Sequence, residues 1–449
     1  MNLLDFEKQH KDILETIEEW NYLRIKVGFF LKNKDQNRKK IQRRNLFTII
    51  RFSMKSLRYA FYKFSNWFGK YEYIFFSDSS ERRLINHKYF DKLSDDIIYK
   101  LGKNTLLIEN PTAGHYSNSY TENIVSLNIL KAFIAILSIV NITVSNESIK
   151  RLQKILNKNN INIDPMKEIK KFKISYYVYK VLFKIYKPKV VFVNCAYCMQ
   201  SMIKAANDLH INTIEIQHGV ISNMHFGYVS CLKINNSYYA QQLLSFGEQE
   251  KKLANMIIPS ITPIGNFYLE YISKNFVYNE QLRKYILPYR ISIGVSMQDQ
   301  EWERKLLFDF IRDYSEKYSD TLFILIPRKK KSFPPFPKNV MVFDQIDCYE
   351  TIMHCDIHMT LYSSCALEAP SLGIPNILLN KKNMAQDYYE DLLDSYHTRF
   401  VNTIEESRKY IKELLILNKH NIVKKNNNVF YEEYSENILT FLQDIKNGY

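Results

Sequence analysis

The sequence lacks a run of apolar residues long enough to cross a membrane. Its most apolar run, residues 132–140, is far shorter than the roughly 20 residues that a membrane-spanning helix needs, and Lys131 interrupts it on one side. The first twenty residues, MNLLDFEKQHKDILETIEEW, are acidic and amphipathic, so they lack the basic and apolar order of a signal peptide. These absences predict no transmembrane helix and a chain that stays in the cytoplasm.

The sequence also lacks the common motifs of metal and nucleoside-triphosphate sites. It has no Asp-x-Asp between apolar strand residues, no His-Glu-x-x-His and no Gly-x-x-x-x-Gly-Lys. Its six cysteines include one C-x-x-C pair, Cys195 and Cys198, and no second pair completes a zinc site. Because this pair follows the apolar run VVFVN, we interpret both residues as small side chains at the end of a buried strand, with metal or redox use as the alternative. We expect no metal ion, no cofactor and six free thiols.

Apolar and aromatic side chains are abundant instead. Hydrophobic residues make up 46% of the 449 residues and include 33 Tyr and 28 Phe, far too much for a disordered chain. A chain of this length exceeds one hydrophobic core, so two domains of roughly 200 residues are expected. The 62 Lys and Arg exceed the 47 Asp and Glu by 15, which suits nucleic acid, an anionic membrane or an acidic substrate, and which a biased genome would also produce.

Residues 1–70 have the pattern of helices, because apolar positions recur at spacings of three and four among many cations. Eight Lys and Arg between residues 38 and 58 precede a group of aromatic residues, namely Phe61, Tyr62, Phe64, Trp67 and Phe68. This pattern is typical of a helix that lies on an anionic membrane, with an ordinary solvated face as the alternative. No recognised RNA-binding motif contains these aromatics.

Beyond residue 70, short apolar segments alternate with longer helical ones, the pattern of a parallel α/β sheet. The first half predicts strands at residues 73–78, 105–110, 190–195, 213–218, 243–247 and 261–266, and the second half at 291–296, 321–327, 340–345, 357–362 and 376–380. Two series predict two sheets. With a linker between Glu270 and Tyr289, we expect a helical N-terminal extension over residues 1–70, one Rossmann-like domain over 71–270 and another over 285–449.

Ligands of open α/β sheets bind beyond the carboxyl ends of the strands, so the residues there are the first candidates for a site. In TLYSSCALEAPSLGIPNILLN, residues 360–380, a strand ends at Ser363 and Ser364 and a helix begins that carries Glu368. Hydroxyls and free N–H groups at a helix start suit a phosphate, and Glu368 is placed to reach a ribose or sugar hydroxyl. The alternative is that Ser364 only caps its own helix.

A second strand end lies in TIEIQHGVISNMHFGY, residues 213–228, where Gln217, His218 and Gly219 enter a turn. His218 could act as a base, or as a donor to phosphate when protonated, and a structural hydrogen bond is its alternative role. Gly219 would allow a close backbone approach or a positive φ. This segment therefore supplies the first candidate for a catalytic base.

Two charged residues follow other predicted strands. Asp78 ends the first strand and is the second candidate base, although in SDSSE it is also a natural turn or helix cap. Arg328 follows TLFILIP and could neutralise the phosphates of a leaving nucleotide, with a solvated basic loop as the alternative.

The order of strand, Ser363, Ser364, Glu368 and Leu-Gly-Ile-Pro resembles the donor site of glycosyltransferases with the GT-B fold. It resembles in particular bacterial capsule and lipopolysaccharide enzymes, among them sialyl- and Kdo-transferases, in which a serine pair holds the donor phosphate. The Gln-His-Gly element is similar to a second part of those enzymes. Segments such as FFSDSSERR (75–83) and ITPIGN (261–266) extend the resemblance over about residues 70 to 380.

This resemblance implies an α/β protein of GT-B type, whose two Rossmann-like domains face an interdomain cleft. It implies that the N-terminal domain, residues 71–270, binds the acceptor and that the C-terminal domain, residues 285–449, binds the nucleotide sugar. It implies a metal-independent, inverting transfer of a sugar from a nucleotide-sugar donor, CMP-linked donors included, to a hydroxyl of a capsule, lipopolysaccharide or lipid-linked glycan. The implied base is His218 or Asp78, and the implied donor-binding residues are Ser363, Ser364, Glu368, Arg328, Gly219 and Gln217. The basic N-terminal region would make the protein peripheral at the inner membrane face, and no nucleic-acid partner is expected.

Three alternatives fit parts of the pattern. The segment EAPSLGIP resembles UDP-sugar 2-epimerases, but these carry Gly-Gly after the first serine, where this chain has Ser364 and Cys365, and their N-terminal Gly-Thr-Arg-Pro is missing. A glycerophosphotransferase of the teichoic-acid type would perform related chemistry. A basic nucleic-acid or membrane-binding protein is the alternative outside the enzymes, because a fold does not define a function.

Overall fold

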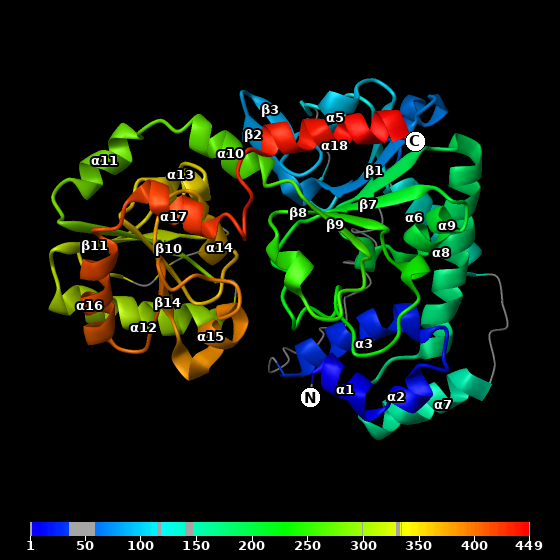
Figure 1. The fold of residues 1–449 in the computed structure, drawn as a ribbon, viewed down its shortest axis with the longest axis horizontal. Coiled ribbons are helices and arrows are strands. Elements are labelled where there is room, and N and C mark those ends of the chain that lie inside the picture. The colour runs from blue at the N-terminus through cyan, green and yellow to red at the C-terminus, as the bar shows by residue number, and fades with distance from the viewer. Residues whose placement is uncertain are drawn as a thin grey trace. The chain divides into compact units, whose positions relative to one another are not determined.

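The computed structural model describes residues 2–35, 59–114, 118–139, 147–298, 300–328, 333 and 335–448. Contacts divide the chain into two compact units. The first contains Met1–Ser245, Glu250–Pro263 and Ser435–Tyr449, and the second contains Phe246–Gln249 and Ile264–Tyr434. Each unit is built on its own parallel sheet, so the predicted pair of α/β sheets is confirmed (Figure 1).

The sheet of the first unit has seven parallel strands in the order β5-β4-β1-β6-β7-β8-β9. They are β1 (Tyr73–Asp78), β4 (Thr105–Asn110), β5 (Ile124–Ser126), β6 (Val190–Val193), β7 (Asn212–Ile216), β8 (Gln242–Ser245) and β9 (Ser260–Pro263). The central strands are apolar at nearly every position because helices bury both faces of a parallel sheet. A separate antiparallel pair is formed by β2 (Arg82–Ile85) and β3 (Lys88–Asp91).

The sheet of the second unit has six parallel strands in the order β12-β11-β10-β13-β14-β15. They are β10 (Ile291–Ser296), β11 (Thr321–Ile326), β12 (Val340–Val342), β13 (Ile357–Thr360), β14 (Asn376–Leu379) and β15 (Thr398–Val401). Both sheets begin in the middle, run to one edge, and then return to continue on the other side, which is the strand order of doubly wound, Rossmann-like sheets. The point where the order reverses lies between β1 and β6 in the first unit and between β10 and β13 in the second.

Helices cover the sheets of both units. Those of the first unit are α1 (Leu3–Gln9), α2 (Lys11–Leu14), α3 (Trp20–Asp35), α5 (Asp95–Leu101), α6 (Asn128–Leu137), α7 (Glu147–Lys158), α8 (Pro165–Tyr186), α9 (Gln200–Asn207) and α18 (Tyr434–Gly448). Those of the second are α10 (Phe267–Lys274), α11 (Glu280–Ile286), α12 (Glu301–Lys317), α13 (Cys348–Met353), α14 (Cys365–Ser371), α15 (Met384–Tyr389), α16 (Ile404–Leu414) and α17 (Lys419–Asn426). Short 3₁₀ turns are η1 (Phe64–Phe68), η2 (Ser79–Glu81), η3 (Ala196–Cys198), η4 (Asn236–Tyr238), η5 (Gln249–Lys252) and η6 (Lys381–Asn383).

The long helix α8 shows how local sequence sets the bounds of an element. It begins at Pro165, whose fixed φ suits a first helical position, and Asp164 caps it by accepting a hydrogen bond from Lys167 N at 3.2 Å. It ends where Lys187 adopts a left-handed conformation with φ of 48°. Its apolar face joins the hydrophobic core that covers one side of the first sheet.

The N-terminal helices α1 to α3 belong to the first unit instead of forming a separate extension. Phe6, Trp20 and Leu23 are almost completely buried in the same core as the sheet residues Ile74 and Phe76. Large apolar side chains at helical spacing are what the sequence pattern detected, and here they pack inward. The basic residues between 38 and 58, on which the membrane prediction depends, lie outside the described residues.

The division between the units also differs from the continuous ranges predicted. The expected linker between Glu270 and Tyr289 contains part of α10 and all of α11, and both helices belong to the second unit. The chain also returns at its end, because α18 is part of the first unit (Figure 1). There Lys446 Nζ donates to the Lys100 carbonyl at the end of α5 at 3.3 Å.

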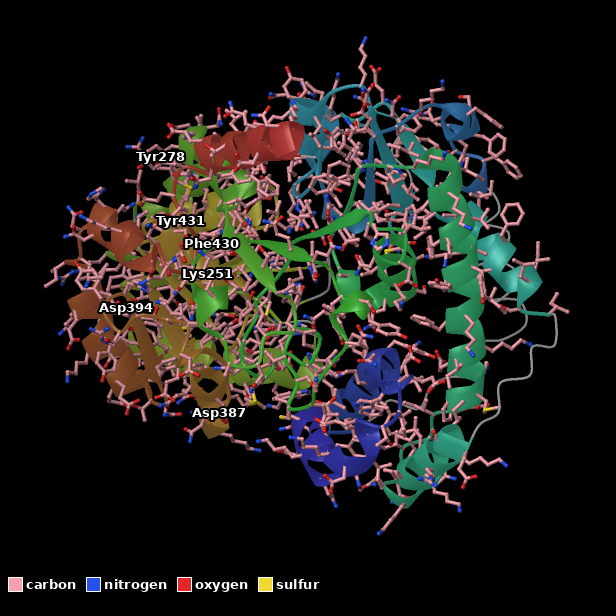
Figure 2. The ribbon with its side chains drawn as sticks, turned by 45° about the vertical axis from the view of Figure 1, so that its right-hand side comes forward. Lys251, Tyr278, Asp387, Asp394, Phe430 and Tyr431 are labelled. Atoms are coloured by element: carbon pink, nitrogen blue, oxygen red, sulfur yellow. The ribbon has the colours of Figure 1, made fainter. Side chains whose placement is uncertain are left out.

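The short segment Phe246–Gln249 belongs to the second unit although β8 and η5 on either side belong mainly to the first. The Phe430 ring stacks on Phe246 with ring centres 5.0 Å apart, and Tyr431 N donates to the Phe246 carbonyl at 2.7 Å. Figure 2 labels Phe430 and Tyr431 on the segment that follows α17. These contacts explain why so short a piece of chain changes unit.

Among the helices in the described ranges, none is both long and apolar enough to span a membrane.

Candidate functional site

The carboxyl edge of the first sheet gathers polar residues because all its strands run in the same direction. Asp78 and Asn110 end the neighbouring strands β1 and β4 and are register partners. Asn194 directly follows β6, and His218 comes two residues after β7 ends. Both predicted base candidates, Asp78 and His218, therefore lie at the edge where parallel sheets bind ligands.

His218 presents a buried ring nitrogen at this edge. Its Nδ1 atom is buried and has no hydrogen-bond partner within the described part of the chain. Burial lowers the pKa of the imidazole; Glu81 and the backbone of Asn194 act in the opposite direction, and Lys92 lowers it further. A neutral imidazole with an unoccupied ring nitrogen can accept a proton.

Gln217 and Gly219 form the turn around His218. Gln217 is buried, and its Nε2 donates to Glu250 Oε1 at 2.8 Å and to the Gly219 carbonyl at 3.0 Å. Of the two roles considered for Gly219, a close backbone approach or a positive φ, the structure excludes the second, because this residue is not among the glycines with positive φ. The hydrogen bonds of the Gln217 side chain hold the turn. A Cβ atom at Gly219 would meet nothing within 4 Å, so the space beside Gly219 is open.

Asp78 has a structural task in this unit. Its Oδ1 accepts hydrogen bonds from Ser80 N (2.9 Å) and Ser80 Oγ (2.7 Å), which makes it the cap of η2. Its Oδ2 accepts from Asn110 Nδ2 and from Thr112 Oγ1, both at 2.6 Å. The predicted cap is confirmed, and both carboxylate oxygens are engaged.

Aromatic and acidic side chains cluster beside His218, and two of them, Tyr197 and Glu215, were not predicted from the sequence. The Tyr197 ring centre lies 6.1 Å from that of His218, 5.4 Å from that of His225 and 5.3 Å from that of Tyr228. Glu215 Oε1 accepts from Tyr228 Oη (2.7 Å) and from the backbone N of Ala196 (3.1 Å). Burial raises the pKa of Glu215 to about 8. The glutamate within the apolar run TIEI is a sequence signal that could have pointed to Glu215.

The C-x-x-C pair agrees only in part with the prediction, because Cys195 follows the buried strand β6 whereas Cys198 lies in the turn η3. Cys195 comes two residues after β6, Cys198 is exposed, and all six cysteines are free, as expected. No group of three or more His, Cys, Asp or Glu side chains in the described ranges is arranged to hold a metal ion.

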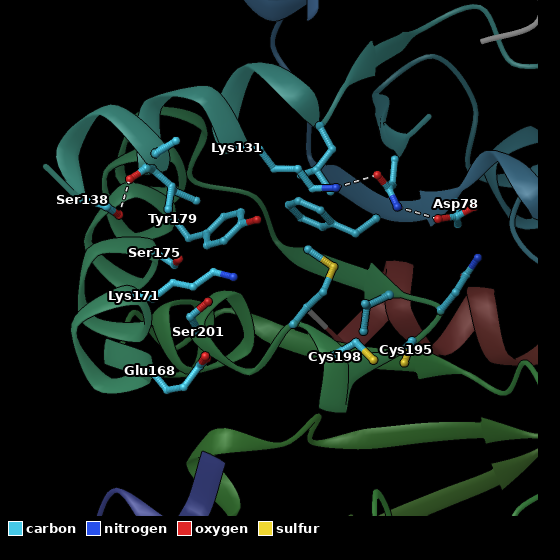
Figure 3. A pocket seen from close by; sticks show the side chains of 18 of the residues that line it. Asp78, Lys131, Ser138, Glu168, Lys171, Ser175, Tyr179, Cys195, Cys198 and Ser201 are labelled. Atoms are coloured by element: carbon cyan, nitrogen blue, oxygen red, sulfur yellow. Dashed lines mark hydrogen bonds between the residues drawn. The ribbon is translucent and has the colours of Figure 1, made fainter. Parts of the chain in front are cut away.

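A cavity of about 1030 Å³ opens at the carboxyl edge of the first sheet. It is lined by Asp78 at the end of β1 and by Asn194 and Cys195 after β6, so it lies at the point where the strand order reverses. Lys131 Nζ donates to Asn110 Oδ1 at 2.7 Å, and Figure 3 shows this bond and the next one to Asp78. Asp78 faces this cavity, whereas His218 is not part of its lining.

In the second unit, Ser363 and Ser364 lie between the end of β13 and the start of α14. They follow one of the two strands between which the strand order reverses, the position where Rossmann-like sheets bind nucleotides. Ser364 occupies the cap position of α14, yet its side chain makes no capping hydrogen bond. Its Oγ is 3.5 Å from Glu368 Oε2, and Ser363 Oγ is 3.4 Å from Cys365 N, so both hydroxyls are only weakly engaged.

Glu368 is buried in α14, and its carboxyl group forms a hydrogen bond with the side chain of Tyr349 on α13. Tyr349 has a pKa well above its ordinary value, mainly because of burial, and a hydrogen bond with Glu368 adds to the effect. The thiols of Cys348 and Cys365 lie 3.8 Å apart beside it. Glu368 therefore helps to hold α14 against α13.

Arg328 is exposed at the carboxyl end of β11, and one strand, β10, lies between β11 and β13. The same edge carries two further polar contacts that the sequence did not reveal. Gln298 Nε2, after β10, donates to Thr360 Oγ1 at 3.2 Å, and Tyr389 Oη donates to the Ser363 carbonyl at 2.6 Å. The predicted donor residues of this unit thus share one sheet edge.

Comparison with known protein families and with characterised protein sequences finds no match. Among solved structures, the chain is similar to one from Listeria monocytogenes assigned as a UDP-N-acetylglucosamine 2-epimerase, with 11% identity and a TM-score of 0.49 over 85% of this chain and 96% of the other. It is similar to the glycosyltransferase SnogD of Streptomyces nogalater, with 12% identity and a TM-score of 0.47 over 84% and 99%. It is also similar to the UDP-GlcNAc 2-epimerase of Methanocaldococcus jannaschii in complex with UDP-GlcNAc and UDP, with 14% identity and a TM-score of 0.46 over 83% and 99%. Because these TM-scores are below 0.5, the assignment of the fold rests on the strand order of the two sheets and not on these similarities.

Proposed function

We propose that this protein is a metal-independent, inverting glycosyltransferase of GT-B type that moves a sugar from a nucleotide sugar to a hydroxyl of a capsule or lipopolysaccharide acceptor. The observation that carries the proposal is the position of Ser363 and Ser364. They lie where the strand order of the second sheet reverses; the Ser364 hydroxyl makes no capping hydrogen bond, and the Ser363 hydroxyl accepts only a long one of 3.4 Å from Cys365 N. A nucleotide phosphate at this position would be bound as in other Rossmann-like sheets.

The second unit would bind the donor, a CMP-linked sugar being one candidate. Ser363 and Ser364 would donate hydrogen bonds to the phosphate. The exposed Arg328 would add a positive charge at the same edge as the leaving nucleotide departs. These groups would supply the charge stabilisation that a metal ion gives in other enzymes.

The first unit would supply the catalytic base. The buried Nδ1 of His218 would take a proton from the acceptor hydroxyl as it attacks the anomeric carbon. The burial that lowers the pKa of His218 favours this role because it keeps the ring neutral and able to accept a proton. Asp78 is the weaker candidate because its two oxygens already accept four hydrogen bonds.

The acceptor would be met in the cytoplasm at the inner face of the cell membrane. Phe61 and Phe68 support this part, since they are 66% and 78% exposed and stand near Lys63 and Lys70 in the chain. Exposed aromatics beside lysines suit an anionic lipid surface.

The experiment is thermal unfolding of the full chain with CMP, UDP, GDP and CDP, repeated with the double variant Ser363→Ala/Ser364→Ala. We expect one nucleotide to raise the unfolding temperature of the wild type and to lose this effect in the double variant. Ser395→Ala is the matched control, because Ser395 is an exposed serine of the same unit. No shift with any nucleotide in folded protein would favour a nucleic-acid or membrane-binding protein instead.

Turnover then separates the enzymes that share this fold. A transferase releases nucleotide only when an acceptor hydroxyl is supplied. An epimerase changes a UDP-sugar without any acceptor, and a glycerophosphotransferase consumes CDP-glycerol.

A further inference from the structure

The cavity at the carboxyl edge of the first sheet has an excess of positive charge. Lys131 on α6 and Lys167, Lys170 and Lys171 in the first two turns of α8 line it. Figure 3 labels Lys131 and Lys171. Within the described part of the chain, none of the four ammonium groups forms an ion pair. Four lysines from two helices thus line one cavity.

The positions of these lysines are electrostatically unfavourable for positive charge. The N-terminal end of a helix carries partial positive charge and disfavours cations, yet three lysines occupy this end of α8, where Glu168 is the only acid of the first turn. Lys131 and Lys171 are also close enough to repel. Burial lowers the pKa of Lys131 first, Asp78 opposes this, and Lys171 lowers it further. Such an arrangement is compensated when an anion binds among the lysines.

The two carboxylates of the lining are engaged elsewhere. Asp78 accepts hydrogen bonds from Ser80, Asn110 and Thr112. Glu168 Oε2 lies 3.6 Å from Lys26 Nζ in an ion pair with α3. Neither carboxylate therefore neutralises the lysines fully, and the charge of the lining stays positive.

The rest of the cavity wall is largely apolar and much larger than one small ion requires. Its larger apolar residues are Phe76, Leu127, Ile134, Tyr179, Val193 and Met199. A volume of about 1030 Å³ matches the upper range of pockets for drug-sized ligands. The shape and chemistry suit a molecule with one or two anionic groups on a larger uncharged body.

We propose that this cavity holds the anionic part of the acceptor, in which Lys131 and Lys171 bind a carboxylate or phosphate group beside a larger uncharged body, while the acceptor hydroxyl that reacts at His218 lies outside the cavity lining. The role of the bound molecule as the acceptor depends on the proposed glycosyltransferase function. The binding of an anionic group by the lysines does not depend on it. Lys131 is oriented for this task by its hydrogen bond to Asn110 Oδ1. An acidic glycan and a lipid phosphate share this chemistry.

Calorimetric binding to the full chain, without any nucleotide, tests the proposal with two matched pairs of probes. Sialyllactose against lactose differs by one acidic sugar, and geranyl phosphate against geraniol differs by one phosphate. We expect the charged member of one pair to bind at least about tenfold more tightly than the neutral one. A preference for sialyllactose identifies an acidic glycan, and a preference for geranyl phosphate identifies a lipid phosphate. Equal binding within both pairs would overturn the proposal.

Two charge-matched double variants locate the binding. Lys131→Gln/Lys171→Gln should weaken the preferred probe by about tenfold or more. Lys173→Gln/Lys184→Gln removes the same charge from exposed positions of α8 outside the cavity lining and should stay within about twofold. An equal loss in both variants would show attraction to the overall charge and would contradict a site in the cavity.

The nucleotide experiment in the same proteins separates this proposal from the proposed function. A nucleotide shift without any anion preference would remove the acceptor chemistry and leave the glycosyltransferase. Anion binding without a nucleotide shift would leave an anion site in the first unit and remove the glycosyltransferase.

Discussion

At the scale of single residues, a buried ion pair connects the N-terminal helices to the segment that follows the His218 turn. Arg24 Nε donates to Glu7 Oε1 at 2.7 Å, and both side chains are fully buried. Arg24 also donates to the carbonyls of Phe226 (2.5 Å) and Val229 (2.9 Å). Helix α3 thereby fixes the backbone on both sides of Tyr228.

Glu7→Gln should destabilise the first unit strongly. The substitution leaves the Arg24 guanidinium buried without its anion, so we expect a loss of about 3–5 kcal/mol in the free energy of unfolding, measured with urea. Asp12→Asn, an exposed acid of α2, should change it by less than about 0.5 kcal/mol. Equal effects of the two variants would contradict a structural role for this pair.

Glu215 should make stability depend on pH. Its pKa is raised to about 8 in the folded protein, mainly by burial, and is near 4.3 in an unfolded chain. The folded state therefore keeps the proton longer, so this contribution to stability is complete below about pH 4 and is lost as the pH rises to about 8. We expect the free energy of unfolding of the wild type to fall through this window relative to Glu215→Gln, by up to about 1.4 kcal/mol per pH unit. Parallel curves for the two proteins would refute the raised pKa.

At the scale of elements, two glycines predicted to lie near strand ends have opposite environments. A Cβ atom at Gly247 would lie 2.3 Å from the Asn428 carbonyl oxygen and 2.6 Å from that of Val429. A Cβ atom at Gly219 would have no neighbour within 4 Å. Only Gly247 is needed for packing.

Gly247→Ala should destabilise the second unit by about 1–3 kcal/mol, because backbone atoms must move to make room. Gly219→Ala is the matched control and should stay within about 0.5 kcal/mol in the same urea experiment. If Gly219→Ala destabilised the protein as much as Gly247→Ala, the open space beside the His218 turn would be refuted.

Strands that are buried on both faces were predictable, and short or polar ones were not. The runs YIFFSD, TLLIEN and ISIGVS gave the bounds of β1, β4 and β10, because a central parallel strand is apolar almost throughout. β5 has only three residues, β15 contains Arg399, and β2 and β3 form a polar hairpin. Such segments depend on partners elsewhere in the fold and carry little local signal.

At the scale of the whole molecule, the sequence predicted two sheets but not how the chain is shared between the units. The assignment of α18 to the first unit, and of Phe246–Gln249 to the second, depends on contacts between residues far apart in the sequence. The site shows the same limit. Strand ends at Ser363 and His218 were predictable, whereas the four hydrogen bonds of Asp78 and the lysines of the cavity became visible only when several elements were placed together.

The most direct test of the proposed function is turnover by His218→Ala, with His420→Ala, an exposed histidine of α17, as the control. The rate of nucleotide release from the preferred nucleotide sugar, with acceptor present, is measured beside the thermal shift with the free nucleotide. We predict that His218→Ala keeps the nucleotide shift and loses about 10²-fold or more in kcat, while His420→Ala keeps both. Full activity of His218→Ala would contradict His218 as the base, and no transfer by the wild type with any nucleotide sugar would contradict a glycosyltransferase.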